Sequence, residues 1–270
     1  MARTVELFND TMGDVSQAQF RWALLDGDKS LASGSDNLTM PSGDHLERTI
    51  QMTMPQVSER RQFKLRLTID VRSEEKFRED YTIEVFPRQV RWQPLNAPIV
   101  LFDPKGTLEK LWKNVAFRSL KQLQDWDGQG LLVIAPEALT PSGVVDVAEI
   151  GGAPGQSQWL AQQVQKGARV LVLEQSESAS DWLPVQIGNQ SSTLAFPQIT
   201  SHPILRGITA DDLRWWRGDH LVSHHEPMRS GLAGVRPLVI TGSVRGVANT
   251  PLVEIRQGNG VWLICQLQVV

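Results

Sequence analysis

The sequence predicts two domains: a β-sandwich, followed by an α/β domain whose mostly parallel sheet carries an antiparallel hairpin at one edge. In residues 5–85, apolar and polar positions alternate between short turn segments, as they do in half-buried antiparallel strands. From residue 98 onward, continuous apolar runs alternate with helical patterns, which is the order of a parallel sheet covered by helices. The proline-rich stretch between them is typical of a linker, so we expect domains at 1–88 and 98–270, joined by 89–97.

The first domain is predicted from segments of period two that are separated by turns rich in Gly, Asp and Ser. Several short strands at this spacing, without a convincing amphipathic helix, favour a sandwich of antiparallel sheets. Trp22 lies on one of these strands, where its ring is expected to fill the core between the sheets. The segments are QFRWALLD, LERTIQMTM, FKLRLTIDV and YTIEVFP.

The second domain begins with PIVLFDP, an apolar run suited to a strand that is buried on both faces. A helix with Thr107 as its N-cap is expected to follow, and its apolar face is Leu108, Leu111, Trp112 and Val115. GLLVIAP predicts a second buried strand, and SQWLAQQVQKG predicts a helix that Gly167 ends before a third strand, ARVLVLEQ. Near the end, Gly258-Asn259-Gly260 between two apolar runs predicts the hairpin at the edge of the sheet.

Composition and charge argue against several classes of protein. The net charge is −3 and the basic residues are scattered, which favours neither a nucleic-acid partner nor a membrane surface. No apolar run approaches the roughly 18 residues that span a bilayer, and the N-terminus lacks the pattern of a signal peptide. The chain ends in LICQLQVV, an apolar strand, so we expect a piece of a longer polypeptide. Its compartment stays open, because a periplasmic or secreted parent would carry its signal upstream.

Several catalytic motifs are missing from the sequence. It contains no G-x-S-x-G elbow, no G-x-G-x-x-G fingerprint and no P-loop. Cys265 is the only cysteine, so neither an intramolecular disulfide nor a cysteine-based zinc site can form. It lies in an apolar run, where a cysteine usually acts as a small hydrophobic residue. We therefore expect no catalytic thiol and no cofactor.

Three acids follow the predicted buried strands: Asp103, Glu137 and Glu174. In open α/β sheets, ligands bind just beyond the carboxyl ends of the strands. If the strands are neighbours, these carboxylates line one side of a crevice and could act as an acid–base pair or bind sugar hydroxyls or a cation. The alternative is that each is a solvated loop residue.

The segment 202–227 gathers four of the five histidines of the chain. His220 and His224 are four residues apart, and on a helix they would share a face suited to zinc. The surrounding residues do not favour a helix, and on a strand the two side chains would be roughly 13 Å apart, too far to chelate one ion. We therefore expect no metal site. His220 is expected to cap or brace a neighbouring loop, with His224 and His225 exposed.

Two adjacent tryptophans, Trp215 and Trp216, lie in the same segment close to Asp219 and His220. This arrangement suits stacking against a sugar ring, with hydrogen-bonding groups at its sides. The alternative is that one ring packs into the core and the other covers an interface between the two domains. With His202, which opens the segment, these residues join the three acids as candidates for ligand binding, and none is assigned a catalytic role.

Several stretches resemble known families. ELFNDT, RWALLDGD and FKLRLTIDV are similar to an immunoglobulin-like module of glycoside hydrolase family 2 enzymes, in which NDT is a recurrent entry motif. VLFDPKG, LLVIAPEAL, KGARVLVLEQ and DLRWWRGDH resemble the class I glutamine amidotransferase-like fold, in the non-catalytic form found in bacterial β-galactosidase-type enzymes. Together these stretches cover nearly the whole chain, and they imply an immunoglobulin-like sandwich followed by a flavodoxin- or amidotransferase-like sheet.

The sequence departs from this family at the catalytic positions. A working amidotransferase has a nucleophilic cysteine after the strand matched by ARVLVL, where this chain has Glu174 or Gln175. A (β/α)₈ glycosidase domain is also missing from the sequence. The resemblance therefore implies a non-catalytic accessory fragment of a glycoside hydrolase, which supports carbohydrate binding or the assembly of domains and subunits. Its expected partners are the catalytic domain of the parent polypeptide, an oligosaccharide and a second copy of the chain.

Two other functions stay open on the sequence alone. One is a stand-alone hydrolase that uses the strand-end acids together with His220. The other is a pure scaffold, in which the surface of Trp215 and Trp216 serves protein contact.

Overall fold

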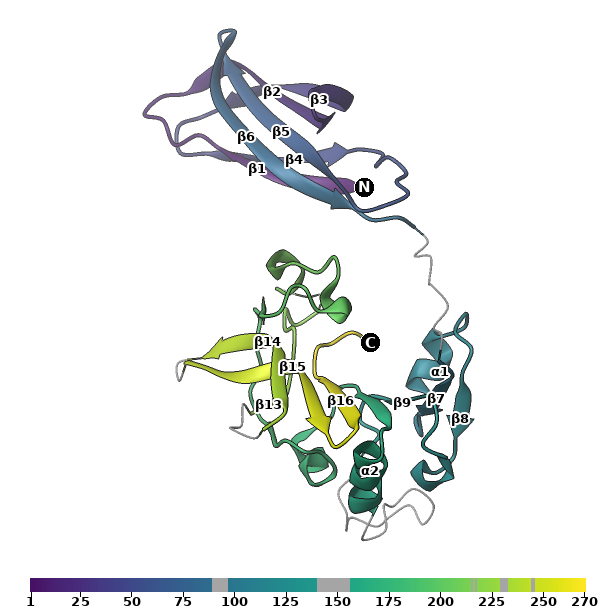
Figure 1. The fold of residues 1–270 in the computed structure, drawn as a ribbon. Coiled ribbons are helices and arrows are strands. Elements are labelled where there is room, and N and C mark those ends of the chain that lie inside the picture. Colours follow the sequence, from purple (N-terminus) through teal and green to yellow (C-terminus); the bar gives the residue numbers. More distant parts are fainter. Residues whose placement is uncertain (89–96, 140–155, 215, 217, 229–232, 244–245) are drawn as a thin grey trace. The chain divides into compact units, whose positions relative to one another are not determined.

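The computed structural model describes residues 1–88, 97–139, 156–214, 216, 218–228, 233–243 and 246–270. The chain forms two compact units, residues 1–93 and 94–270, and both are rich in strands (Figure 1). Apart from Ala97, the linker expected at 89–97 lies outside the described residues.

The N-terminal unit is a β-sandwich in which a smaller and a larger antiparallel sheet enclose one core. The smaller sheet pairs β1 (Ala2–Phe8) with β4 (His45–Gln51). The larger sheet has the order β3-β2-β5-β6, formed by Lys29–Met40, Val15–Asp26, Arg61–Val71 and Glu74–Val85. The hydrophobic core joins Leu7 and Ile50 of the smaller sheet to Phe20 and Leu65 of the larger one. The β-rich first unit predicted from the period-two pattern is confirmed.

Strand β2 shows how this period sorts the side chains. Phe20 and Leu24 are buried in the core, whereas Arg21 between them is exposed. Trp22 is half-buried and packs against the core from its margin. Its ring lies against Gly34 of β3, where an added Cβ would come within 2.6 Å of the indole nitrogen. The tryptophan therefore covers the edge of the core instead of filling its centre.

The NDT stretch after β1 forms a turn that is held by one buried side chain. The Asn9 carboxamide donates hydrogen bonds to the carbonyl oxygens of Met40 (3.1 Å) and Pro41 (2.9 Å). Its oxygen accepts from the backbone N–H of Thr11 at 3.2 Å. Asn9 thus ties the end of β1 to the end of β3, which gives this asparagine a structural role.

The C-terminal unit is built on a mixed sheet whose strand order is β12-β14-β15-β16-β10-β9-β7-β8. The strands at one end of this order, β8-β7-β9-β10-β16, are parallel neighbours. They are Arg118–Leu120, Ile99–Phe102, Leu131–Ile134, Arg169–Val172 and Gly260–Cys265. The buried strands predicted from the three apolar runs are confirmed as β7, β9 and β10.

Beyond β16 the sheet is antiparallel, through β15 (Gly246–Gln257), β14 (Val235–Ser243) and β12 (Phe196–Pro197). The predicted hairpin is confirmed between β15 and β16, with Gly258 in the left-handed conformation at φ 60°. Its position at the edge is corrected, because β14 and β12 extend the sheet further. Leu238 and Val239 of β14 are fully buried, so this strand forms part of the core. The sheet is therefore mixed, with a parallel part of five strands and an antiparallel extension that is larger than a single hairpin.

Helix α1 (Thr107–Leu111) is much shorter than the sequence pattern suggests. The helical face predicted as far as Val115 is wrong, and Leu111 is 60% exposed. The chain leaves the helix at Trp112, whose ring meets that of Phe117 edge to face, with the ring centroids 6.4 Å apart. Both rings pack against the core, and this packing prevails over a pattern that a longer helix would also satisfy.

Helix α2 (Gln156–Gln165) precedes β10 and, as predicted, ends before Gly167. Leu160 on this helix is fully buried, as are Leu132 of β9 and Trp262 of β16. Within the described residues, no helix is long and apolar enough to cross a membrane. The other elements are short: β11 (Ile187–Gly188), β13 (Glu226–Pro227), and 3-10 turns at Leu123–Asp125, Glu177–Trp182, Pro203–Leu205 and Ala210–Asp212.

Candidate functional site

The carboxyl ends of β9, β10 and β16 meet at one side of the sheet, called the carboxyl edge below. Gln175, just beyond β10, is fully buried there. Its side-chain nitrogen donates to the carbonyl oxygens of Ala135 (2.7 Å) and Leu173 (2.8 Å), and its oxygen accepts from the N–H of Leu139 (2.9 Å). Its backbone N–H donates to the side-chain oxygen of Gln266, also fully buried, at 2.8 Å. One glutamine therefore joins the segments that follow three parallel strands.

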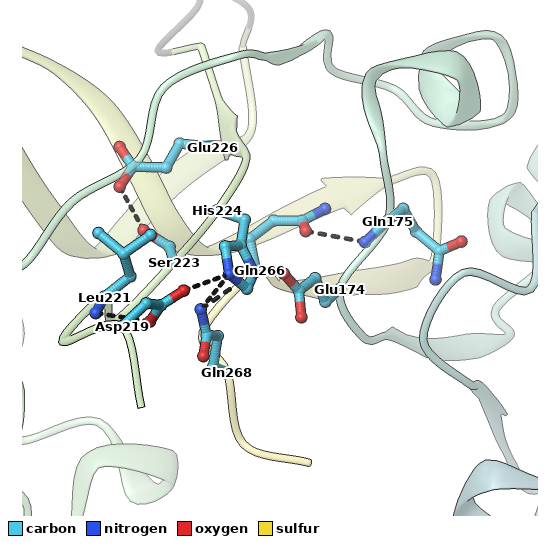
Figure 2. A network of polar contacts seen from close by, with 9 residues as sticks. All are labelled: Glu174, Gln175, Asp219, Leu221, Ser223, His224, Glu226, Gln266 and Gln268. Carbon is cyan, nitrogen blue, oxygen red and sulfur yellow. Dashed lines mark hydrogen bonds and ion pairs between the residues drawn. The ribbon is translucent and has the colours of Figure 1, made fainter. Parts of the chain in front are cut away.

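Beside Gln175, a histidine lies between two carboxylates (Figure 2). Nδ1 of His224 is 2.6 Å from Oε1 of Glu174, and its Nε2 is 3.0 Å from Oδ2 of Asp219. When both bonds form, both ring nitrogens carry protons, because a carboxylate only accepts. The side-chain nitrogen of Gln268 lies 2.8 Å from Nε2 and 3.0 Å from Nδ1 of the same ring. We call Glu174, His224, Asp219 and Gln268 the His224 clasp.

The pKa values of this group follow from the geometry. The hydrogen bond to Glu174 is the main cause that raises the pKa of His224, against the opposing effect of burial. The pKa of Asp219 is lowered, first by the backbone N–H of Leu221 at 3.0 Å and then by His224. An imidazolium beside an ionised Asp219 is thus favoured between the ordinary pKa values of the two groups, 3.8 for Asp219 and 6.5 for His224.

The loop that carries His224 is anchored from its other side by a buried carboxyl group. Glu226, on β13, is fully buried, and it accepts hydrogen bonds from the hydroxyls of Ser223 and Thr241. The N–H of Gln268 also donates to the carbonyl of Val222 at 2.9 Å. These contacts fix the loop and the last residues of the chain against the carboxyl edge.

Asp103 has a different environment from that of Glu174. Its carboxylate accepts from the backbone N–H groups of Thr107 (3.0 Å), Leu108 (2.7 Å) and Glu109 (3.1 Å). These are the donors that the first turn of a helix leaves without partners. Asp103 therefore stabilises the start of α1, where the sequence had predicted Thr107 as the cap. The residue directly before the helix is Gly106, which has no side chain that could cap it.

Glu137 is the strained member of the three strand-end acids. It is exposed and has a φ of 54°, in the left-handed region that only a few per cent of non-glycine residues adopt. Its N–H donates to the carbonyl oxygen of Glu174 at 2.8 Å. The backbones of these two acids are therefore joined, whereas the carboxylate of Asp103 is bound by the amides of α1.

The remaining candidates lie in other contacts. His202 has its Nε2 3.1 Å from Oε2 of Glu254 on β15, while its Nδ1 accepts from the N–H of Ile204. The indole of Trp216 donates to the carbonyl of Asp212 at 2.5 Å, and the half-buried ring packs on the core. The position of Trp216 is thus fixed by this hydrogen bond and by packing on the core. Trp215 lies outside the described residues.

His220 is exposed, with a φ of 65°. Its neighbour Asp219, predicted as a candidate, is joined to His224, which the sequence reading had left exposed and unassigned. Gln175, Gln266 and Gln268 were also missed as candidates. A signal for them exists in the sequence, since a glutamine within an apolar run such as VLVLEQ or LICQLQ needs a buried hydrogen-bond partner.

Two groups at the carboxyl edge, the thiol of Cys265 and the imidazole of His224, are poorly placed for nucleophilic or metal-binding chemistry. Cys265 at the end of β16 is buried, and burial raises the pKa of its thiol to about 11, so it does not form a thiolate near neutral pH. Both nitrogens of His224 face carboxylates and so do not present a lone pair to an ion. Among the described residues, no group of three or more His, Cys, Asp or Glu side chains is arranged to hold a metal.

The sequence matches no protein-family model and no curated protein. Among solved structures, a cold-adapted β-galactosidase from Rahnella sp. R3 is similar at a TM-score of 0.36 and 14% identity, over 64% of this chain and 29% of that chain. A cytoplasmic protein from Salmonella typhimurium is similar at a TM-score of 0.37 and 10% identity, over 77% of this chain and 84% of that chain. At these values neither neighbour decides what the chain does, and its assignment depends on the side chains described above.

Proposed function

We propose that this chain is a non-catalytic accessory part of a larger glycoside hydrolase, where it supports carbohydrate binding or the assembly of domains and subunits. In this proposal, the sandwich is an immunoglobulin-like module, and the α/β unit is an amidotransferase-like domain without its nucleophile. The catalytic domain of the parent polypeptide is then the main partner.

The observation that carries the proposal is the set of hydrogen bonds made by the turn after β10. A nucleophile at that position needs an exposed, reactive atom beside a base. Here Gln175 is fully buried and its carboxamide is bonded to backbone groups of the β9 and β10 segments. The preceding Glu174 is bonded to His224. These bonds are typical of a turn that connects neighbouring segments of the fold.

The strand-end acids give the same support. A hydrolytic pair of carboxylates has to face one space that admits the scissile bond, with the two groups about 5–9.5 Å apart. The carboxylate of Asp103 instead binds three amides of α1, and that of Glu174 binds His224. The hydrolase alternative is therefore less well supported than the accessory role.

The His224 clasp suits an accessory role because it fixes a surface. His224 holds its loop on the carboxyl edge, and the backbone N–H of Gln268 ties the C-terminal residues to the carbonyl of Val222 in the same loop, so that neither segment has to be ordered when a partner binds. Preorganisation of this kind lowers the entropic cost of association.

The test is turnover by the purified full chain on nitrophenyl galactosides, glucosides and mannosides. We expect release of nitrophenol at the rate of the buffer alone, and the same rate with Glu137→Gln and Glu174→Gln. Hydrolysis above the buffer rate that either substitution abolishes would overturn the proposal and favour the hydrolase.

A further inference from the structure

The outer face of the larger sheet in the N-terminal unit has two adjoining hollows that share Arg21. One, of about 660 Å³, lies between Gln19, Asn37 and Asp70. The other, of about 490 Å³, lies over the next stretch of β2 and β3. Both volumes fall in the range of small-molecule sites. We call this pair of hollows the outer-face groove.

The strand register explains why the groove is hollow. On this face, Arg21 stands between Ser35 of β3 and Thr68 of β5, and Ala23 stands between Ser33 and Arg66. Small side chains therefore form the floor over three neighbouring strands. The long side chains of Arg21, Arg66 and Arg78 surround them at the rim. Successive residues of a strand face opposite sides of the sheet, so small residues on the outer face do not change the packing of the core on the inner face.

Each arginine at the rim has an acidic partner, and one of these acids, Asp80, also contacts Lys64 at 3.2 Å. Arg21 contacts Asp70 at 2.5 Å, Arg66 contacts Asp80 at 2.8 Å, and Arg78 contacts Glu75 at 2.5 Å. The hydrogen bond from Arg66 holds the pKa of Asp80 well below its usual range, so this carboxylate stays ionised. The groove thus presents both N–H donors and carboxylate acceptors while its rim carries little net charge.

Non-glycine residues with positive φ gather at one end of the groove. Of the five non-glycine residues with positive φ in the described part of the chain, Gln17 (57°), Arg72 (51°) and Ser73 (67°) belong to this end. The N–H of Arg72 donates to the carbonyl of Gln17 at 3.2 Å, so the β5–β6 turn and a bulge of β2 touch there. Gln17 and Ser73 both line the larger hollow. Arg72 and Ser73 are the two turn residues of the β5–β6 hairpin, where positive φ is the usual conformation, so the unusual backbone at this end is that of Gln17.

We propose that the outer-face groove binds a neutral oligosaccharide. Sugar hydroxyls both donate and accept, and an arginine paired with a carboxylate offers a donor and an acceptor side by side. Serine and threonine hydroxyls and the carboxamides of Gln19 and Asn37 add further groups of both kinds. The paired charges of the rim favour an uncharged ligand over an anionic polymer. Adjoining hollows suit more than one sugar ring.

This inference deepens the proposed accessory role, on which it rests, by naming a ligand class and the unit that binds it. The test is isothermal titration calorimetry of the full chain with cellopentaose, mannopentaose and β-1,4-galactopentaose. Pentagalacturonate is the acidic probe. We expect saturable binding of at least one neutral probe, and weaker or no binding of the acidic one.

Two substitutions place the binding in the groove. Ser35→Phe puts a large ring on the floor of the smaller hollow, and Ser30→Phe on the same strand is its control outside the groove. Arg78→Ala removes a rim arginine that is 51% exposed, and Arg118→Ala in the other unit is a matched control, 52% exposed and also paired with an acid. We expect about tenfold weaker binding, or more, for each groove variant, and unchanged binding for each control. A melting temperature close to that of the parent chain shows that each variant is folded.

Three results would overturn the inference: no saturable binding of any neutral probe, saturable binding of the acidic probe alone, or neutral binding that Ser35→Phe and Arg78→Ala leave unchanged. Each of these would leave the accessory role standing. Conversely, turnover of nitrophenyl glycosides would overturn the accessory role and leave the groove as a binding site, so the two failures are distinguishable.

Discussion

The carboxyl edge of the α/β sheet and the outer-face groove of the sandwich both gather polar and charged side chains, but they differ in how these groups are engaged. At the carboxyl edge, the carboxamide of Gln175 is buried and bonded to the backbone, and the carboxylate of Glu174 is bonded to His224. In the groove, the rim arginines meet acids beside open space over small residues. Polar residues at the side of a fold where ligands usually bind do not by themselves indicate a binding site. It is more informative to ask whether their hydrogen bonds are already made within the protein.

The largest effect on this comparison is expected from Gln175→Ala. The change leaves the N–H of Leu139 and the carbonyls of Ala135 and Leu173 without their partner in a buried setting. We expect the free energy of unfolding to fall by about 3 kcal/mol, measured by urea denaturation. Gln162→Ala, at an exposed position of α2, is the control and should change it by less than about 0.5 kcal/mol. A loss below about 1 kcal/mol for Gln175→Ala would mean that this side chain does not hold the carboxyl edge together.

A smaller effect is expected from Asp103→Ala, which removes the acceptor of three amides at the start of α1. The free energy of unfolding should fall by about 1–2 kcal/mol, by the same measurement. Asp211→Ala, at a carboxylate that is 72% exposed and paired with Arg214, should change it by less than about 0.5 kcal/mol. If the two substitutions had equal effects, Asp103 would not be needed to stabilise α1 and would again be a candidate for ligand binding.

The smallest effect concerns the His224 clasp and depends on pH. The folded-state pKa of His224 is raised, so its contribution to stability is fully present below the ordinary value of 6.5 and is lost as the pH rises through the folded-state value. That of Asp219 is lowered, so its contribution is present above 3.8 and is lost as the pH falls through its folded-state value. The clasp should therefore be most stabilising between these two pH values.

Thermal unfolding of His224→Gln against pH measures this dependence. Because the His224 side chain is 43% exposed, solvent screens the interaction, and the parent chain should exceed the variant by only about 0.5 kcal/mol within that window. The difference should shrink toward alkaline pH. His220→Gln, in the same loop but outside the clasp, is the control. A difference that grows as the pH rises above 6.5 would contradict the clasp.

Much of the fold could be predicted from local sequence pattern because the pattern records which faces are buried. Phe20 and Leu24 alternate with the exposed Arg21, and the continuous run of β9 is buried on both faces. The same pattern failed for α1, since apolar residues at helical spacing also serve a turn in which the rings of Trp112 and Phe117 meet edge to face. It also failed for β14, because the number of strands beyond a hairpin depends on tertiary pairing.

The candidate site was only partly predictable, for the same reason. Glu174 and Asp219 were candidates because of their positions after a strand and beside histidines. The group that joins them, His224, lies 50 residues from Glu174 in the sequence. Nothing in the local spacing distinguishes His224 from His220 or His225. The choice among them is made by the path of the loop, which Glu226 fixes through a contact with Thr241 fifteen residues away.

The most direct test of the account is amide chemical-shift mapping by NMR on the full chain during titration with the neutral oligosaccharides named above. The account predicts shifts in β2, β3 and β5 around Arg21, Ser35 and Thr68 and at the start of β6 around Arg78, with the amides of Glu174 and Gln175 unchanged. Shifts at Glu174 and Gln175 with the outer-face groove unchanged would contradict it, because they would show that the carboxyl edge is the open site and the groove only a surface.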